Sequence, residues 1–179
     1  RLGDTRGRLL GGQRKNGMPP LVSGPIFQIC WVVEEIEAAE QEFTRQWGVE
    51  RWLRMPDIAF GPETTTYRGE PADYVVHVSI GYAGSQQLEL IQPVSGRNLY
   101  TEFLETHGVG VHHMAWVPDD YEATLLEAER RGMSVVQQGR VEGAGMEFSY
   151  LDAGPLGGYV ELMKLSPEIR LMFASLIPD

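Results

Sequence analysis

Two hydrophobic patterns follow each other near the start of the chain. Residues 26–33 (Ile-Phe-Gln-Ile-Cys-Trp-Val-Val) are mostly β-branched or aromatic, which predicts a strand buried on both faces. Residues 34–47 carry an apolar stripe with three- and four-residue spacing, which predicts an amphipathic helix. The stripe consists of Ile36, Ala39, Phe43 and Trp47. Gly48 follows, and glycine there can take the left-handed backbone that commonly ends a helix.

The pattern continues with strands and one long polar segment. Residues 51–55 predict a second strand, whereas residues 56–71 are rich in Gly, Pro and Thr and predict a loop long enough to suggest function or mobility. Residues 73–82 and 86–92 predict two strands, and the Ala-Gly-Ser between them indicates a hairpin. A short helix is expected at residues 99–107.

The second half of the chain resembles the first when the two are offset by 85 positions, which places Gln28 on His113. In this register the first helix corresponds to a second helix at residues 119–131. Three more strands are then expected at residues 135–138, 146–152 and 158–164. The sequence therefore contains an internal repeat of roughly 70–85 residues, each copy of which predicts a βαβββ module.

We therefore predict an α+β fold in which two βαβββ modules form a paired, cleft-forming mixed β-sheet with flanking helices. The expected organisation is a flexible basic leader at 1–20, modules at 21–97 and 109–165, a linking helix at 98–108, and a C-terminal helix at 166–179. Together these segments would form one structural domain. The apolar C-terminal helix would pack on the domain or across a dimer contact.

Charge, hydropathy and cysteine count argue against some classes of partner. The formal charge of −10 argues against a nucleic-acid partner, because binding to phosphate backbones relies on basic surface. The chain has no apolar run long enough to span a membrane and no signal-peptide pattern, so no membrane partner is expected. A single cysteine, Cys30, excludes an internal disulfide framework and favours a reducing, cytoplasmic location.

Four polar residues occupy equivalent positions in the two halves, each inside an apolar strand: Gln28, Glu89, His113 and Glu161. Unpaired polar groups are costly in such places, and a divalent metal would provide the positive charge that two buried acids need. This mixed set of nitrogen and oxygen ligands is compatible with Co, Ni, Zn, Mn or Fe. The alternative is that Glu89 and Glu161 face solvent and that His113 is a hydrogen-bonded core histidine.

Adjacent histidines pose a separate question, because neighbouring side chains in a strand point to opposite faces. His112 and His113 should therefore not share one site. The repeat aligns His113 with Gln28, so we expect His113 to face inward and His112 to face outward.

The predicted modules and their polar quartet resemble the vicinal oxygen chelate superfamily, also called the glyoxalase/bleomycin-resistance/dioxygenase fold, over residues 25–165. Residues 103–116 (Phe-Leu-Glu-Thr-His-Gly-Val-Gly-Val-His-His-Met-Ala-Trp) look like the methylmalonyl-CoA epimerases. Residues 88–93 (Leu-Glu-Leu-Ile-Gln-Pro) and 159–162 (Tyr-Val-Glu-Leu) also look like that family. The resemblance makes the second histidine of the pair the metal ligand.

One ligand departs from the epimerase pattern. Those epimerases usually have histidine where this chain has Gln28. The set Gln, Glu, His and Glu instead looks like eukaryotic-type glyoxalase I. Glutamine is a neutral oxygen donor, so a bound divalent metal would have a similar charge.

The resemblance implies a metal-dependent isomerase or epimerase that removes a proton next to a carbonyl through an enolate. It gives Glu161 one acid–base role and places a second in a strand of the first module. His77 is the candidate there, with Glu70 a weaker one. A small-molecule substrate, possibly an acyl-CoA or another thioester, and a homodimer are expected. A glyoxalase I-like isomerase, or a drug-binding protein without catalysis, stays an alternative, whereas an extradiol dioxygenase is disfavoured because its two-histidine, one-carboxylate set is absent.

Overall fold

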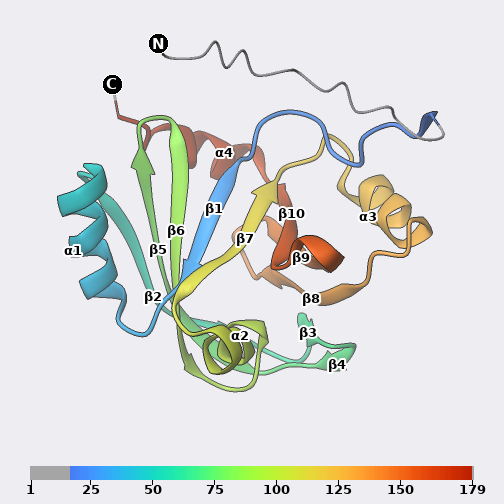
Figure 1. Ribbon diagram of the computed structural model, residues 1–179, viewed down its shortest axis with the longest axis horizontal. Helices are drawn as coiled ribbons and strands as arrows, with labels where there is room; N and C mark the ends of the chain where they lie inside the picture. Colours follow the sequence, from blue (N-terminus) through green and yellow to red (C-terminus); the bar gives the residue numbers. More distant parts are fainter. Residues whose placement is uncertain (1–16, 179) are drawn as a thin grey trace, which may run out of the picture.

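A computed structural model describes residues 17–178, which form a single curved sheet flanked by helices (Figure 1). Sixteen of the first twenty residues, the predicted leader, lie outside this range. The chain runs through ten strands: β1 (Gln28–Val32), β2 (Trp52–Phe60), β3 (Thr65–Tyr67), β4 (Glu70–Pro71), β5 (Tyr74–Ala83), β6 (Gln86–Ser95), β7 (Gly110–Trp116), β8 (Val135–Val141), β9 (Met146–Asp152) and β10 (Tyr159–Leu165).

The strand order in the sheet is β2-β5-β6-β1-β7-β10-β9-β8-β3-β4. At its centre β1 runs antiparallel to β7. On either side of this pair β1 runs parallel to β6, and β7 runs parallel to β10. The predicted α+β class with a mixed, cleft-forming sheet is confirmed. The boundaries of the two sequence modules stay a prediction.

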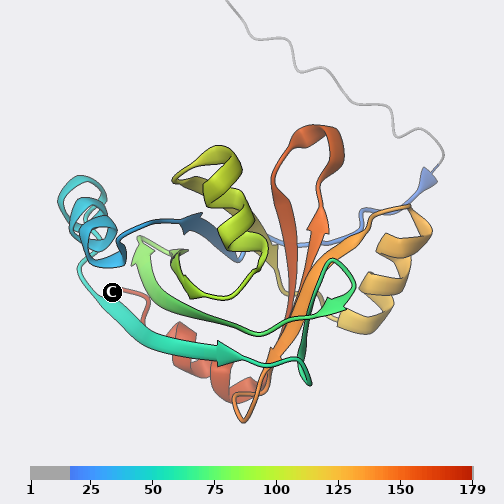
Figure 2. The ribbon, with the colours of Figure 1, turned by 90° about the horizontal axis from the view of Figure 1, so that it is seen from below.

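Four α-helices cover the sheet: α1 (Ile36–Trp47), α2 (Leu99–His107), α3 (Tyr121–Arg130) and α4 (Pro167–Ala174). Figures 1 and 2 show α1 and α3 at opposite sides of the molecule, each against the strands of its own half. Gly48 ends α1 with a left-handed backbone, φ 70°, as its position after the apolar stripe predicts. No helix in the described part of the chain is long and apolar enough to cross a bilayer.

The segment expected to be a loop, residues 56–71, is largely strand. β2 continues through it to Phe60, with a register shift against β5 between Met55 and Ile58. Asp57 takes a positive φ of 54° at this shift, so the strand bends without ending. β3 and β4 then form a small hairpin whose first strand pairs with β8. Pairing with a distant strand outweighs the turn-rich composition that predicted a loop.

The C-terminal helix is shorter than predicted. Ser166 caps α4 by accepting a hydrogen bond from the Ile169 backbone N–H, and Pro167 at the first helical position suits a helix start. Helical structure ends at Ala174. α4 packs on the core through Phe173, which is 6% exposed, while Leu171 on the same helix is 72% exposed.

Candidate metal centre and active site

The four predicted ligands lie on four adjacent strands in the middle of the sheet. Gln28 is on β1, Glu89 on β6, His113 on β7 and Glu161 on β10, and these strands neighbour one another in the order β6-β1-β7-β10. All four side chains are buried, with exposed fractions between 1% and 7%. The alternative that the two acids face solvent is therefore wrong.

Three of these side chains converge closely. His113 Nε2 lies 3.0 Å from Glu161 Oε2 and 3.4 Å from Glu89 Oε2. Four buried polar side-chain atoms in the described residues lack a hydrogen-bond partner, and three of them belong to predicted ligands. These three are Gln28 Oε1, His113 Nε2 and Glu161 Oε2. Buried polar groups are normally paired, so the three atoms leave room for a shared partner.

The charges of the site are strongly coupled. Burial raises the pKa of Glu161, and the neighbouring His113 only partly offsets that rise. Burial alone would lower the pKa of His113, but Glu161 and Glu89 outweigh it and raise the pKa to about 9. A charged imidazole therefore neutralises part of the acid cluster when no other cation is present.

A chain of hydrogen bonds orients the amide of Gln28. The Tyr82 hydroxyl donates to the backbone carbonyl of Phe173 in α4 (3.0 Å) and accepts from Gln87 Nε2 (2.7 Å). Gln87 Oε1 in turn accepts from Gln28 Nε2 at 2.7 Å. Because a carbonyl can only accept, the direction of the whole chain is set. It leaves Gln28 Oε1 as the free atom on the site side.

These donors match a divalent cation. An amide oxygen, an imidazole nitrogen and two carboxylates suit Zn, Ni, Co, Mn or Fe. With His113 neutral, all of these atoms are acceptors and cannot pair with one another. A protonated His113 would pair with Glu161, 3.0 Å away, and would still leave Gln28 Oε1 without a partner. The unpartnered atoms therefore fit a metal better than they fit an ordinary polar core.

Cys30 belongs to the same cluster and was missed in the sequence. It is fully buried and is the direct partner of Glu89 on β6 and of His113 on β7. Ligand atoms of Cys30, Glu89 and His113 lie within 4.8 Å of one another. Burial, followed by the charge of Glu89, raises the pKa of the thiol. The signal that could have found it is the two-residue spacing from Gln28, which puts both side chains on one face of β1.

The expectation that His112 faces outward is wrong. Cys30 pairs with His113 and Trp31 pairs with Val111, so the register skips His112. This irregularity breaks the alternation, and both His112 and His113 are buried, at 1% and 2% exposed. Val111 and Met114 on either side of them are 49% and 39% exposed. A β-bulge re-aims a side chain in this way.

The second predicted base does not reach the site. Val76 and Val78 line the central cavity, so the side chain of His77 between them points to the other face of β5. There its Nδ1 accepts a hydrogen bond from the Asp57 backbone N–H at 3.0 Å. The weaker candidate, Glu70, is exposed on the short edge strand β4. The geometry thus excludes both residues from the cavity.

An enclosed, mainly apolar cavity of about 110 Å³ adjoins the polar cluster. Gln28, Glu89 and Glu161 line it, together with Tyr100 and Tyr150, whose hydroxyls are 2.8 Å apart. Three residues of α4 also line it: Ile169, Met172 and Phe173. Burial strongly raises the pKa of both tyrosines, so their hydroxyls keep their protons.

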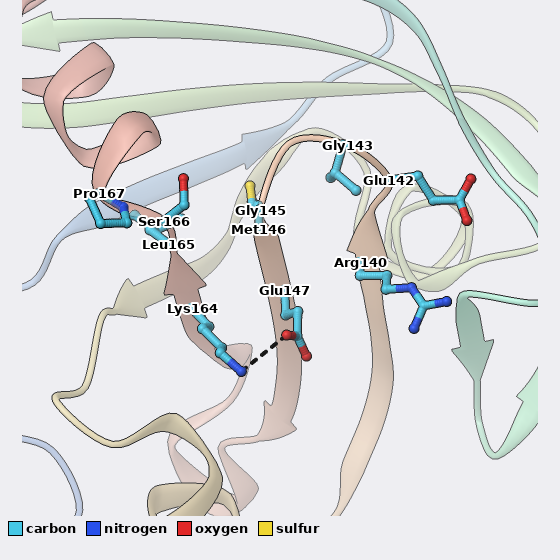
Figure 3. Close-up of a pocket in the computed structure, with 11 residues that line it drawn as sticks. Arg140, Glu142, Gly143, Gly145, Met146, Glu147, Lys164, Leu165, Ser166 and Pro167 are labelled. Atoms are coloured by element: carbon cyan, nitrogen blue, oxygen red, sulfur yellow. Dashed lines mark ion pairs between the residues drawn. The ribbon is translucent and has the colours of Figure 1, made fainter.

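A larger, open groove of about 790 Å³ lies next to the cavity and shares Val141 and Met146 with it. Figure 3 shows Arg140 on β8 and Lys164 on β10, with Glu147 of β9 between them. Lys164 Nζ pairs with Glu147 at 3.2 Å. The groove therefore carries both signs of charge, with Arg140 and Lys164 set against Glu142 and Glu147, next to an apolar cavity.

Solved structures of methylmalonyl-CoA epimerases have a similar fold. The enzyme from Mycobacterium tuberculosis aligns with a TM-score of 0.60 at 16% identity, over 87% of this chain and 97% of that one. A variant of the Streptomyces coelicolor enzyme in complex with 2-nitronate-propionyl-CoA gives a TM-score of 0.61 at 19% identity, over 79% and 94%. At such identities the likeness establishes the fold alone.

Sequence comparison identifies a superfamily for this chain but no individual relative. No curated protein sequence matches it. The family model of the Glyoxalase/Bleomycin resistance protein/Dioxygenase superfamily matches residues 27–150, a span that contains three of the four predicted ligands. The chain therefore belongs to the Glyoxalase/Bleomycin resistance protein/Dioxygenase superfamily.

Proposed function

We propose that the protein is a divalent-metal-dependent isomerase or epimerase that removes a proton from the carbon next to a carbonyl. The observation that carries this proposal is that His113 Nε2 lies between two buried carboxylates, while Gln28 Oε1 is buried without a partner in the lining of the adjoining apolar cavity. We assign Gln28, Glu89, His113 and Glu161 as the residues that would hold the metal. When bound, the ion would act as a Lewis acid on the substrate carbonyl.

Glu161 is the proposed base. Its burial raises its pKa, which suits a general base at neutral pH while the carboxylate is not bound to the metal. It also lines the cavity, where the apolar walls would exclude water from the reacting carbon. In this role Glu161 accepts the proton from that carbon and holds it until it is returned.

Epimerisation returns a proton to the opposite side of the carbon, so an epimerase needs a second proton donor. The Tyr100 hydroxyl replaces His77 as the candidate, because it lines the cavity, whereas Tyr150 is the cross-strand partner of Glu161 itself. A structural neighbour, the Streptomyces coelicolor methylmalonyl-CoA epimerase variant, binds 2-nitronate-propionyl-CoA, and this supports an epimerase reaction for the present protein. The CoA part of such a substrate would lie along the open groove, near Arg140 and Lys164.

A glyoxalase I-like isomerase is the second candidate. One observation favours it: Gln28 completes a glyoxalase I-like ligand set. In such a reaction Glu161 alone would move the proton between neighbouring carbons. The acids among the cavity-lining residues are Glu89 and Glu161, both assigned as ligands. A single-base reaction requires no further group from the cavity.

Metal content tests the site directly. Glu89→Ala and His113→Ala should each lose most of the metal that the purified wild-type protein binds, because each removes one ligand of four. His77→Ala is the matched control, since that histidine lies on the other face of β5. Elemental analysis after dialysis against cobalt or nickel gives the measurement. Full metal content in both ligand variants would refute the proposed site.

The reaction is tested by solvent deuterium. The metal-loaded protein should incorporate deuterium next to the carbonyl of a 2-methyl-acyl-CoA if it is an epimerase, or convert a glutathione hemithioacetal if it is glyoxalase I-like. Mass spectrometry of each substrate separates the two. A metal-loaded protein that binds these compounds without exchange would favour the non-catalytic alternative.

A further inference from the structure

His112 makes a direct contact with the predicted ligand His113. Their Nδ1 atoms lie 2.9 Å apart, a hydrogen-bond distance between two ring nitrogens. The contact exists because the bulge in β7 brings both side chains to the buried side of the sheet. Each imidazole thus has one nitrogen committed to the other, while its Nε2 lacks a hydrogen-bond partner.

The direction of this hydrogen bond follows from what a metal ligand requires. His113 Nε2 is the atom that faces the two carboxylates, so it must offer a lone pair to a metal. A neutral imidazole carries its proton on the other nitrogen, which here is Nδ1. His113 therefore donates from Nδ1, and His112 Nδ1 must accept.

Aromatic packing holds His112 in the accepting position. Its ring lies 5.2 Å from Tyr100, 5.0 Å from Phe103 and 4.9 Å from Tyr159, measured between ring centroids. Two of these neighbours come from α2 and one from β10. The side chain is 1% exposed, so it cannot turn away from His113 without displacing these rings.

We infer that His112 is a positioning residue that fixes the ring orientation and the tautomer of His113, with Nε2 presented to the metal. The inference rests on the proposed metal site and deepens it. A ligand histidine commonly donates its second ring N–H to a fixed acceptor, and loss of that acceptor typically weakens metal binding about 10–100-fold. In this chain a second histidine would be the acceptor.

Two substitutions separate the hydrogen bond from the packing. His112→Phe keeps an aromatic ring among Tyr100, Phe103 and Tyr159 but removes the acceptor. His112→Asn keeps an acceptor oxygen near the position of Nδ1 but removes most of the ring. Metal affinity, measured by competition with a chelator, should fall about 10–100-fold in His112→Phe and by much less in His112→Asn. Equal affinity in wild type and His112→Phe would overturn the inference, as would an equal loss in both variants.

The tautomers of His112 and His113 can be determined in the metal-free protein. Long-range ¹H–¹⁵N NMR of the metal-free wild-type protein should show the proton of His112 on Nε2 and a proton on His113 Nδ1. A proton on His112 Nδ1 would overturn the inference even if both variants fold poorly. Failure of the proposed function looks different: the wild-type protein would bind no metal, or His113→Ala would bind it normally, while the NMR result still decides the role of His112.

Discussion

At the scale of single residues, hydrogen bonds outside the polar cluster occupy one polar atom of a side chain and leave its other polar atom without a partner. Gln28 commits its amide nitrogen to Gln87, and His113 commits Nδ1 to His112. In both cases the remaining atom faces Glu161 and Glu89 or the cavity beside them. The same residue types with other partners would present a donor to the site and would repel a cation.

Cys30 allows a test of the ligand set. Its thiol lies in the cluster, but burial and Glu89 raise its pKa, and a thiolate would add a third anion beside two carboxylates. We therefore expect the thiol to stay protonated and Gln28 to be the ligand. Cobalt-loaded protein should lack a thiolate-to-cobalt charge-transfer band, and Cys30→Ala should keep its metal. A strong band that disappears in Cys30→Ala would assign the cysteine to the metal instead.

At the scale of elements, two irregularities matter more than the regular strands. The bulge in β7 places His112 next to His113. The register shift in β2 allows the strand to continue past Pro56. The β3–β4 hairpin follows, and its first strand pairs with β8 in the other half of the sheet. The hairpin is also tied to α2, because Tyr67 and Arg68 both bond to the carboxylate of Glu102.

The Glu102 contact predicts a pH-dependent contribution to stability. Arg68 lowers the pKa of Glu102 from its ordinary value of 4.5, so the folded state favours the charged form. A depressed pKa contributes stability above the ordinary value, and that contribution is lost as the pH falls through the folded-state pKa. Denaturant unfolding should show Glu102→Gln less stable than wild type at pH 7, with the gap shrinking below about pH 4.5.

A neighbouring pair provides the control for this measurement. Glu105 on the same helix pairs with Arg97, and both side chains are more than half exposed, so Glu105→Gln should have a smaller effect. A stability gap for Glu102→Gln that widens toward acid pH would contradict the assignment.

At the scale of the whole molecule, the C-terminal helix is connected to the centre of the sheet. α4 contributes Phe173 and two of its neighbours to the lining of the cavity. The backbone carbonyl of Phe173 also ends the hydrogen-bond chain that runs through Tyr82 and Gln87 to Gln28. α4 therefore helps to orient a predicted ligand on β1.

Tyr82→Phe tests this connection. The substitution removes the hydroxyl that sets the direction of the chain, so the Gln87 and Gln28 amides are free to rotate. Metal affinity should fall about tenfold, as for other groups that orient a ligand, while the ring keeps its packing. Tyr67→Phe removes a hydroxyl that contacts Glu102 and should leave metal affinity unchanged. An unchanged metal affinity in Tyr82→Phe would show that α4 does not help to orient the metal site.

Several features of this protein were determined by local sequence. Hydrophobic spacing predicted α1 and its end at Gly48, and the run at residues 99–107 predicted α2 at its observed bounds. The internal repeat predicted that Gln28, Glu89, His113 and Glu161 would meet, because equivalent polar positions in two similar modules lie on equivalent strands. The structure brings His113 close to both acids and places Gln28 in the lining of the same cavity as the acids, and their role as a metal site stays a prediction.

Tertiary structure alone decided the rest. Residues 56–71 became strand because β5 and β8 offered backbone partners that lie far away in sequence. His77 was directed away from the cavity by the pleat of β5. Both histidines of the pair became buried because the register against β1 skips His112. A bulge depends on how two distant strands align, so it cannot be predicted from the hydrophobic periodicity of either strand alone.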